Sequence, residues 1–598
     1  MKRNGTALIG RIFKITFQST GIYAVLAPLY YLIEGLFPAV ETMVYAMLFD
    51  GAAAWITGGH TGENGKQLWI MAGILVVLSL FRGGLNVIGS IAINIGIYER
   101  LPAFLNQKLA EKCARLSMID FENSEIYDQC LRARECLKRE QISALYMILA
   151  VLFSCILSAA SSGAVLASYS PVIIPLAFLS VIPYFVGFRL LGQKFYRMQK
   201  SQTPARREAE YFWKTLTKPE SVRELRMAGA VEYMEEKWMV QNRKMQRELY
   251  DYRKREACCI LLCDVIQVAG IGASIGLTLY LAVKGQISIG EFGACISAYS
   301  RLQAKAEEFF TESGRLQEKI SFASDYFSFM ELKEEEWGKE QMERFPEEIV
   351  LKDLSFRYPN AERMAVEGVN LTIRKGESIA IVGENGSGKT TLTRLIAGLY
   401  EPSEGQICFK NQNLQEIKRE DSGKWISAID QRFIRYLLTL RENVAISHVQ
   451  DMENDLRILQ CLKEAGMENK AEELDQAVGN LNGGREFSQG QWQRIAIARA
   501  LFRPAELFLM DEPTSALDPV LEAEILQQFL QVLKEKTCVI VSHRIGLCRY
   551  VDRIVVMKDG KAAEVGSHEE LYSRKGEYWR IFNSQSRWYH TEERGTGK

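Results

Sequence analysis

No charged residue occurs between Ile142 and Phe188, and this run constrains the fold more than any other feature of the chain. A helix crosses the hydrocarbon core of a membrane with about 20 apolar residues, so the run is too long for a single crossing. The sequence Ser-Tyr-Ser-Pro at Ser168–Pro171 is typical of a turn. We therefore predict two membrane-spanning helices joined by a tight loop.

Four further apolar stretches are long enough to cross a membrane. They lie at about 20–48, 68–97, 258–283 and 287–309. The last is the weakest, because charged residues occupy its end: Arg301, Lys305, Glu307 and Glu308. Six spans are predicted in all. The basic segment 1–19 has no compact apolar core followed by a cleavage site, so it is predicted to be an amphipathic helix on the membrane surface.

Basic residues indicate which ends of the spans face the cytosol. The segments at about 98–141 and 189–257 are rich in lysine and arginine, whereas the other three loops contain two lysines between them, Lys66 and Lys284. Both termini and the two long segments are therefore predicted to be cytosolic, in a multi-pass protein of the cell membrane. None of the twelve cysteines lies in the outer loops, so no disulfide framework is expected.

Among the charged residues inside the predicted spans, Glu34, Arg82 and Asp264 are the candidates for a functional role. Such residues are costly in a membrane and often functional. They either pair with other helices as structure or line a polar translocation path, and the sequence leaves both interpretations open.

Positive and negative residues are equal in number over the whole chain, but charged residues are distributed unevenly along it. Lysine plus arginine (73) equals aspartate plus glutamate (73), which argues for neither a nucleic acid nor an acidic partner. Uncharged runs dominate the part before about residue 310, while the remainder has the composition of a soluble domain. The chain is therefore predicted to join a membrane domain to a cytosolic one, with no nucleic-acid partner.

A phosphate-binding loop follows a predicted buried strand, SIAIVG, in the soluble part. The segment Gly383–Thr391 reads GENGSGKTT, a G-x-x-x-x-G-K-T pattern that precedes an amphipathic helix. In this setting backbone N–H groups close around phosphate oxygens, and the helix dipole adds positive potential. Lys389 would neutralise the β- and γ-phosphates and the Thr390 hydroxyl would bind Mg²⁺. The other predicted ligand-binding residues of the loop are Gly383, Asn385, Gly386, Ser387, Gly388 and Thr391.

Two later strands end in residues suited to phosphate chemistry. LFLMDE ends in Asp511, suited to Mg²⁺, and Glu512, suited to deprotonating an attacking water. TCVIVSH ends in His543, which would contact the γ-phosphate if its strand lies beside the strand that ends at Asp511. A helix beginning at Ser488 is a third anion-binding candidate, because its free N–H groups and dipole favour negative charge.

In this order the motifs resemble those of ATP-binding cassette (ABC) transporters of the exporter type, over essentially the whole chain. The resemblance implies an α-helical transmembrane domain with six spans and long cytosolic extensions, joined to an α/β P-loop NTPase domain. The expected boundaries are 1–19 for the amphipathic segment, 20–320 for the membrane domain, 321–345 for a linker, 346–585 for the nucleotide-binding domain and 586–598 for a tail.

The resemblance also implies roles for individual residues. In such proteins ATP is bound between one subunit's phosphate loop and the partner's LSGGQ motif, whose place is taken here by Phe487–Gln491, with Ser488, Gln489, Gly490 and Gln491 as ATP contacts. Tyr358 matches the aromatic residue that stacks on adenine, and Gln431 the glutamine that senses Mg²⁺. Asp518 lies in the matching D-loop, and His543 is the switch histidine. Asp120–Gln129 and Lys214–Gly229 resemble the regions that couple the two domains.

One departure from the family pattern stands out: Gln489 replaces the first glycine of LSGGQ, which removes backbone freedom and adds bulk near phosphate. Glu512 and His543 are intact. The protein is expected to pair with a second half-transporter, and a homodimer and a heterodimer both remain open. It is expected to hydrolyse ATP and to export a lipid, a drug-like compound or a peptide. The alternative is an ATP-gated or sensory protein without net transport.

Overall fold

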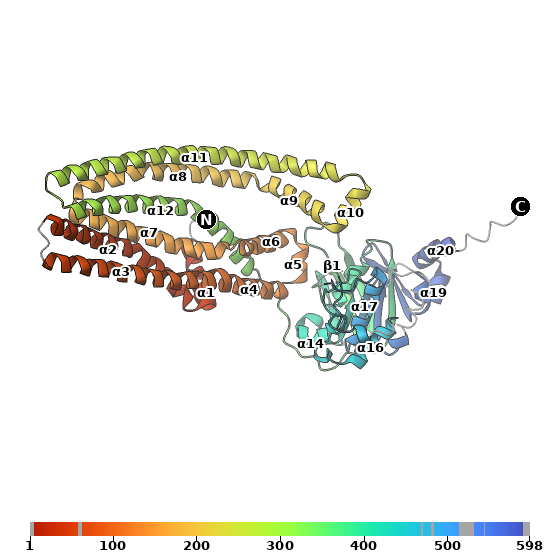
Figure 1. The fold of residues 1–598 in the computed structure, drawn as a ribbon. Helices are drawn as coiled ribbons and strands as arrows, with labels where there is room; N and C mark the ends of the chain where they lie inside the picture. The colour runs from red at the N-terminus through yellow and green to blue at the C-terminus, as the bar shows by residue number, and fades with distance from the viewer. Residues whose placement is uncertain are drawn as a thin grey trace. The chain divides into compact units, whose positions relative to one another are not determined.

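The computed structural model describes residues 5–57, 62–467, 471–479, 483–513, 531–542 and 545–589. They form two compact units: Met1–Ala114 with Asp128–Leu332 make the first, and Arg115–Tyr127 with Lys333–Lys598 make the second. The first unit is helical and the second contains the β-strands (Figure 1). The segment Arg115–Tyr127 therefore packs with the second unit although it lies between helices of the first.

The first unit consists of long helices. Their bounds are α1 Gly5–Thr20, α2 Tyr23–Thr57, α3 Gly62–Ile91, α4 Leu101–Arg115, α6 Ser124–Lys138, α7 Gln141–Tyr169, α8 Ile174–Ser201, α9 Thr203–Thr217, α10 Pro219–Met227, α11 Val231–Val283 and α12 Ile289–Met330. A π-helix, η1 (Ala92–Arg100), joins α3 to α4, and a short 3₁₀ turn, η2 (Pro171–Ile173), precedes α8. The predicted turn at Ser168–Pro171 is confirmed, because α7 ends at Tyr169.

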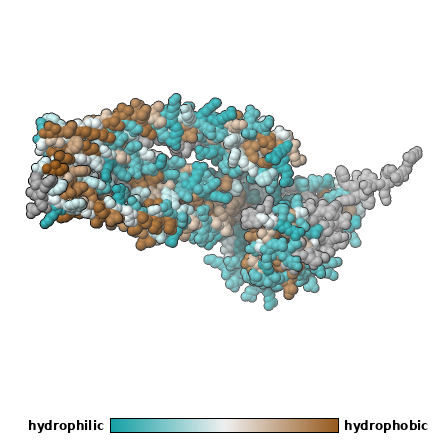
Figure 2. Space-filling model, viewed as in Figure 1, coloured by the Kyte–Doolittle hydropathy of each residue, from teal (hydrophilic) through white to brown (hydrophobic). Residues whose placement is uncertain are grey.

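Apolar composition agrees with a membrane-embedded bundle. Four described helical stretches are long and apolar enough to cross a membrane: Tyr23–Thr57, Gly65–Arg115, Gln141–Tyr169 and Val231–Val283. The apolar part of α8, Pro171–Gly187, is shorter, and α12 has the charged residues that weaken its predicted span. Hydrophobic residues gather on the helical unit toward the α2–α3 and α11–α12 loops (Figure 2).

Small residues lie where the membrane helices meet. On the apolar half of α11 the buried residues are Cys263, Gly270, Ser274 and Thr278, while the large residues Leu262, Val265 and Val268 are exposed. A Cβ atom on Gly270 would lie 2.7 Å from Tyr299 Oη. Close helix contact through small side chains is typical of membrane bundles, where no hydrophobic force drives helices together.

The three candidate residues inside the spans, Glu34, Arg82 and Asp264, each have a partner. Arg82 pairs with Glu34 at 2.7 Å and with Glu41 at 3.4 Å, and Glu41 also lies 3.7 Å from Arg301. Tyr184 donates a hydrogen bond to Asp264. This pairing between α2, α3 and α12, and between α8 and α11, favours the structural interpretation of these charges.

Two sheets form the second unit. One is four-stranded, in the order β2–β1–β4–β5, and the other six-stranded, in the order β10–β9–β3–β8–β7–β6. The strands are β1 Glu348–Phe356, β2 Val366–Arg374, β3 Ser378–Gly383, β4 Glu404–Phe409, β5 Gln412–Asn413, β6 Ile426–Ile429, β7 Leu507–Asp511, β8 Thr537–Val541, β9 Arg553–Lys558 and β10 Lys561–Gly566.

The parallel core of the six-stranded sheet brings the predicted motifs together. β8 pairs with both β3 and β7, so the expectation that the strand before His543 adjoins the strand ending at Asp511 is confirmed. Asp511 is in register with Val541, and Val541 with Ile381. The carboxyl ends of these strands therefore meet at one edge, where ligands of open α/β sheets bind.

Helices of the second unit cover the sheets and connect the strands. They are α5 Met118–Glu122, α13 Lys389–Ile396, α14 Arg419–Lys424, α15 Leu440–Ala445, α16 Asp455–Glu464, α17 Gln489–Phe502, α19 His568–Arg574 and α20 Glu577–Tyr589. α12 continues to Met330, ten residues into the segment expected to be a linker. Most of the expected tail, from residue 590 onward, lies outside the described residues.

Candidate functional site

A cavity of about 770 Å³ lies at this edge of the six-stranded sheet. Its volume is within the range of small-molecule sites. Its lining contains nine residues predicted from the sequence, together with Ala365: Tyr358, Asn385, Gly386, Gly388, Lys389, Thr390, Thr391, Gln431 and Glu512. These residues come from segments more than 150 positions apart in the chain, and the fold brings them to one surface.

The phosphate loop needs its glycines for two different reasons. Gly386 has a φ of +80° and Gly388 a φ of +97°, in the left-handed region that side chains disfavour. A Cβ on Gly388 would also lie 2.3 Å from the carbonyl oxygen of Ala365. The loop therefore holds its open curve directly before α13, whose first residues, Lys389–Thr391, line the cavity.

Lys389 is the buried cation of the loop, with 5% of its surface exposed. Its Nζ donates hydrogen bonds to the carbonyl oxygens of Gly383 (3.0 Å) and Glu384 (2.8 Å). Burial lowers the pKa of Lys389, and the nearby carboxylates of Glu512 and Asp511 oppose that shift. The Lys389 amine is thus hydrogen-bonded to two neutral carbonyl oxygens, which phosphate oxygens can replace. It also lies close to two carboxylates.

Asp511 is suited to a cation. It is 5% exposed, and among the described residues neither carboxylate oxygen has a hydrogen-bond partner within bonding geometry. Burial raises the pKa of Asp511, and the neighbouring Thr390 hydroxyl opposes the shift. Buried carboxylate oxygens without partners are costly, and a hydroxyl beside a carboxylate is a donor set that Mg²⁺ accepts. These residues therefore fit the ion that the sequence predicted.

Glu512 occupies a strained position at the end of β7. Its φ is +50°, and its N–H donates to the carbonyl oxygen of Val541. The side chain turns toward the cavity, where Gln431 Nε2 donates to Glu512 Oε2 at 2.9 Å. Non-glycine residues rarely adopt this conformation, and such strain clusters at functional sites. The pairing places the two predicted catalytic side chains in contact.

The aromatic side of the cavity is a three-ring cluster. Tyr358 Oη lies 3.1 Å from Thr391 Oγ1, and its ring packs edge-on against Phe356 and Tyr400. Phe356 and Tyr400 stack almost parallel, with centroids 5.2 Å apart. Tyr358 therefore borders the cavity with a ring held in place by its neighbours, as a platform for a planar base requires.

A polar network that the sequence did not reveal continues from this cluster. Tyr400 Oη donates to Glu122 of α5 at 2.8 Å and accepts from Arg394 of α13 at 3.1 Å. Arg394 also lies 3.6 Å from Asp430, the neighbour of Gln431. Ile119 of α5 packs against the core of this unit. The network therefore joins part of the predicted coupling region Asp120–Gln129 to the phosphate-loop helix.

The segment Phe487–Gln491 begins α17 as a capped helix. Ser488 Oγ accepts from Gln491 N, and Gln491 Oε1 accepts from Ser488 N at 2.9 Å, a capping box. Gln489 stands in the first turn and is not among the residues with positive φ. The predicted loss of backbone freedom therefore causes no strain at this position, because the helical backbone accepts glutamine. The effect of the added bulk near phosphate stays a prediction. None of Ser488–Gln491 is among the described residues lining the cavity.

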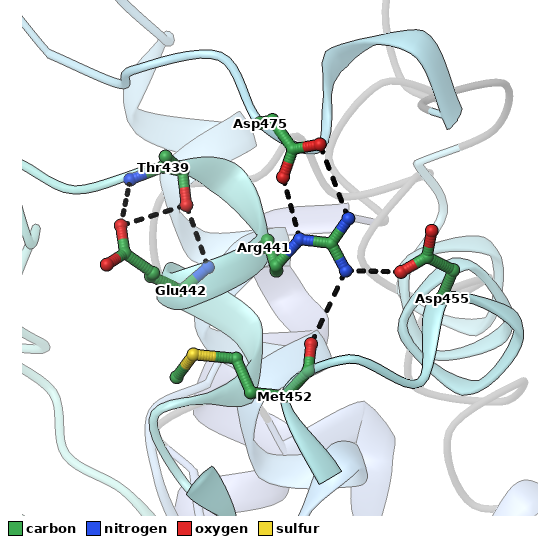
Figure 3. Close-up of polar contacts among 6 residues, drawn as sticks. All are labelled: Thr439, Arg441, Glu442, Met452, Asp455 and Asp475. Atoms are coloured by element: carbon green, nitrogen blue, oxygen red, sulfur yellow. Dashed lines mark hydrogen bonds and ion pairs between the residues drawn. The ribbon is translucent and has the colours of Figure 1, made fainter.

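Arg441 anchors the loop that leads to this helix (Figure 3). Its guanidinium pairs with Asp475 (Nε to Oδ1, 2.7 Å) and with Asp455 of α16. Arg441 N also donates to the carbonyl oxygen of Leu474. Thr439 and Glu442 form the capping box of α15 on which Arg441 stands. These contacts connect Leu474 and Asp475, in the segment before Ser488, to α15, the helix that follows Gln431.

Two predicted residues, His543 and Asp518, lie outside the described residues. Their positions relative to the cavity therefore stay predictions.

Comparison with known proteins agrees with this fold and identifies the family. The family model described as ABC transporter matches residues 366–515. The subtilin transport ATP-binding protein SpaT of Bacillus subtilis is 30% identical, over 85% of this chain and 83% of its own. The nisin transport ATP-binding protein NisT of Lactococcus lactis subsp. lactis is 27% identical, over 96% and 95%. An ATP-dependent lipid A-core flippase of Syntrophus aciditrophicus is 31% identical over 53% of each chain.

A solved structure of a bacterial Atm1-family ABC exporter with ATP bound has the same fold, with a TM-score of 0.75 and 18% identity over 94% of this chain and 98% of that one. The family model, the relatives and the solved structure agree on the family and the fold. The chain therefore belongs to the ABC transporters, as an exporter-type half-transporter of the membrane whose nucleotide-binding domain binds and hydrolyses ATP to drive export.

Proposed function

We propose that this exporter carries a peptide. SpaT and NisT, named for the transport of the peptides subtilin and nisin, align with 85% and 96% of this chain, including most of its membrane domain. The lipid A-core flippase aligns with 53% of it. Because the membrane helices contact the substrate, similarity that extends through them supports the peptide more than similarity confined to about half of the chain.

One observation supports the proposed ATP chemistry: the contact between Gln431 and Glu512 beside Lys389 and Thr390 at a single cavity. Glu512 accepts a proton from the attacking water, and Gln431 holds the carboxylate in position. Lys389 exchanges its two carbonyl acceptors for the β- and γ-phosphate oxygens. Thr390 and Asp511, with Gln431 beside them, would hold Mg²⁺, which neutralises charge on the phosphates when bound.

The ATP site is proposed to be completed by a second subunit. The helix start at Ser488 presents free N–H groups, as a phosphate requires, but it is not part of the lining of this chain's own cavity. In a head-to-tail pair, Ser488 and Gly490 of one subunit face the γ-phosphate in the other. ATP then favours the closed pair, because it gains contacts there that the open pair lacks. A homodimer and a heterodimer both meet this requirement.

Both termini and the nucleotide-binding domain are proposed to be cytosolic, from the distribution of lysine and arginine.

Vesicle transport is the experiment that tests the proposal. The protein is reconstituted with its nucleotide-binding domain facing outward, and a labelled peptide and a labelled lipid A are offered separately with ATP and Mg²⁺. We expect ATP-dependent accumulation of the peptide and none with Glu512→Gln protein. Movement of the lipid without movement of any peptide tested would refute the peptide assignment and leave the ATP chemistry standing.

Substitutions at Ser488 and at Gln489, at the start of α17, are predicted to change ATP turnover to different extents. Ser488→Ala removes the cap of α17, a loss of about 0.5–2 kcal/mol, together with the proposed phosphate contact. We expect it to lower ATP turnover by about tenfold or more. Gln489→Gly changes an exposed side chain in an unstrained turn and is expected to alter turnover by less than about threefold. Steady-state ATPase rates of the native dimer measure both effects. A large increase in ATP turnover in Gln489→Gly would indicate that the native ATP site is degenerate.

Tyr400→Phe is predicted to weaken the link between α5 and the ATP site. The ring remains stacked on Phe356, but Glu122 and Arg394 lose their shared hydroxyl. Glu122 and Arg394 stay 3.8 Å apart as an ion pair, Arg394 keeps Asp430 at 3.6 Å, and both side chains are partly exposed, so losing the hydroxyl costs about 0.5–1.5 kcal/mol. We expect ATP affinity to stay within about twofold while less peptide is moved per ATP hydrolysed. Glu122→Gln, which keeps an acceptor for Tyr400, serves as the milder control, and an unchanged transport-to-hydrolysis ratio in Tyr400→Phe would contradict the link.

A further inference from the structure

Two cysteines of the helical unit lie in contact although they come from different helices. Cys113 is in the last turn of α4, Cys130 is in the first half of α6, and their Sγ atoms are 3.8 Å apart. Both side chains are half-buried, so small water-soluble reagents can reach them. Neither residue belongs to the ATP site, and in the proposed orientation both are cytosolic.

The two sulfur atoms are close enough for a disulfide to form. A disulfide bond is about 2.05 Å long, so the sulfurs have to approach by about 1.8 Å. Cys259 and Cys263 are also neighbours, but they stand four positions apart on α11. Cβ atoms at that spacing on a helix are about 5–6 Å apart, whereas a disulfide requires about 3.5–4.5 Å. The pair on α4 and α6 can therefore close by a small movement of two separate helices, whereas the pair on α11 would require the helix to unwind.

Metal binding is the other common use of neighbouring cysteines, and the surroundings of this pair do not support it. A structural zinc ion is held by about four cysteine, histidine or carboxylate ligands. In the part of the chain that the structure describes, no group of three or more such side chains is arranged to hold a metal ion. Oxidation of the two thiols is therefore the chemistry that this contact supports.

The two thiols differ in their surroundings. Burial, with a smaller contribution from the neighbouring Cys130, raises the pKa of Cys113 to about 11. Cys113 therefore keeps its proton at neutral pH, and its S–H group can donate to Cys130 Sγ. Because the thiolate and not the thiol reacts with oxidants, oxidation begins at Cys130. Cys113 is then the thiol that lies beside the oxidised sulfur.

We propose that Cys113 and Cys130 form a redox-sensitive modification site, which a hydroperoxide converts to a disulfide that slows ATP hydrolysis. The thiolate of Cys130 attacks one oxygen of hydrogen peroxide and the O–O bond breaks. The hydroxide released takes up the proton that Cys130 lost, which leaves water and a sulfenic acid on Cys130. Cys113 Sγ then attacks Cys130 Sγ, the S–O bond breaks, and the hydroxyl leaves as water with the proton of Cys113. The two thiols lose two electrons, and the peroxide gains them.

The chain enclosed by this disulfide is the segment that packs with the second unit. Arg115–Tyr127 belongs to that unit, where Ile119 packs against the core and Glu122 accepts a hydrogen bond from Tyr400. In the reduced protein the two ends of the segment have no covalent link to each other. The disulfide fixes the distance between these ends, so it restricts the movement of α5 that closure of the paired nucleotide-binding domains requires.

The cytosolic location makes this disulfide a reversible one. Thiols are kept reduced in the cytosol, and the disulfides that do form there are usually transient and catalytic or redox-sensing. A dithiol reductant attacks one of the two sulfurs through a mixed disulfide and restores both thiols. The reduced protein is therefore the active form, and the oxidised protein recovers when the peroxide is removed and a reductant is present.

The test uses the full-length dimer in lipid nanodiscs. The protein is treated with hydrogen peroxide, the remaining thiols are blocked with a maleimide, and mass spectrometry of the unreduced digest detects linked peptides. We expect a link between Cys113 and Cys130 within one subunit and none between Cys259 and Cys263. We expect ATP hydrolysis by the wild-type protein to fall by about fivefold or more, the lower end of the coupling between two sites of one protein, and to recover with dithiothreitol.

Serine variants show whether this pair causes the loss of activity. Cys113→Ser and Cys130→Ser each remove the disulfide and are expected to keep their rate of ATP hydrolysis in peroxide. Cys258→Ser, at an exposed position of α11, is the matched control and is expected to respond to peroxide as the wild-type protein does. Recovery of the wild-type protein with dithiothreitol needs no substitution, so the test does not depend on the folding of a variant.

Three results would overturn the proposal. One is the absence of the linked peptide from oxidised wild-type protein, or a link between subunits in its place, which a non-reducing gel distinguishes by mass. Another is a linked peptide with an unchanged rate of ATP hydrolysis. The third is an equal loss of hydrolysis in Cys113→Ser. None of these measurements involves a transported substrate, so their outcome is independent of the proposed peptide.

Discussion

Replacing Glu512 with glutamine is expected to slow ATP hydrolysis by about 10²–10⁴-fold, the range that a general base contributes, while ATP still binds. The geometry makes this substitution conservative. Gln431 Nε2 donates to Glu512 Oε2 at 2.9 Å, and the carbonyl oxygen of a glutamine at 512 can accept the same hydrogen bond. The backbone at φ +50° is fixed by the end of β7 and by the hydrogen bond to Val541, so the variant keeps the shape of the site and loses only the basic oxygen.

Two measurements on the Glu512→Gln variant separate lost chemistry from a damaged site. ATP hydrolysis is followed by phosphate release, and ATP binding by titration with a fluorescent analogue. Because the closed pair is opened by hydrolysis in the proposed cycle, the variant is also expected to accumulate in the ATP-bound closed state, visible by cross-linking between the nucleotide-binding domains of the two subunits. Gln431→Ala, which leaves the carboxylate but removes its partner, is expected to have a smaller effect on the rate. Hydrolysis within about threefold of wild type in Glu512→Gln would contradict the general-base role.

Most of the ATP site was predictable because its determinants are local. The spacing of the residues within Gly383–Thr391 is enough to identify a phosphate loop. The structure gives Gly386 and Gly388 the left-handed backbone that only glycine adopts readily. β3, β7 and β8 are short apolar runs with a polar residue at the carboxyl end, so both their existence and the position of their ends could be inferred. Parallel pairing then brings Gly383, Asp511 and the end of β8 to one edge. The roles of Glu512 and Gln431 stay predictions, although the structure places them in contact.

Contacts between distant segments could not be predicted in the same way. Arg82 and Glu34 were visible as charges inside spans, but their connection through Glu41 to Arg301 depends on how α2, α3 and α12 pack. The pair Tyr400 and Glu122 is separated by 278 positions, and neither residue belongs to a short motif.

Gln489 shows the limit of arguing from a family pattern at one position. The sequence predicts that Gln489, in place of the first glycine of LSGGQ, removes backbone freedom and adds bulk near phosphate. The structure shows an ordinary helical turn, with Ser488 and Gln491 forming the capping box on either side. A glycine's absence is informative only where the backbone requires positive φ or close approach. The effect of Gln489 on the ATP site therefore depends on how its side chain fits against a nucleotide bound by the partner subunit.

Lys389→Ala is expected to weaken ATP binding by about 10- to 100-fold. Lys389 is 5% exposed, and its Nζ is placed by the carbonyl oxygens of Gly383 and Glu384. Hydrogen bonds to charged groups contribute about 1.5–3 kcal/mol, which corresponds to this loss of affinity. Titration of the full-length protein with a fluorescent ATP analogue measures it. Lys375→Ala, which removes an exposed lysine of the same domain paired with Glu347 at 3.5 Å, is the control and is expected to bind ATP as wild type does.

The protonation of Lys389 adds a pH dependence with a definite sign. Burial lowers the pKa of Lys389, so in the nucleotide-free protein the amine loses its proton at a lower pH than an ordinary lysine does. As the pH rises through that range, a growing share of the protein must take up a proton before it can pair with phosphate, and the apparent affinity for ATP falls. The affinity of Lys389→Ala should be flat over the same alkaline range, because the titrating group is gone. Parallel pH profiles for the two proteins would show that another group controls the affinity, and ATP binding within about threefold of wild type in Lys389→Ala would exclude Lys389 as the main phosphate ligand.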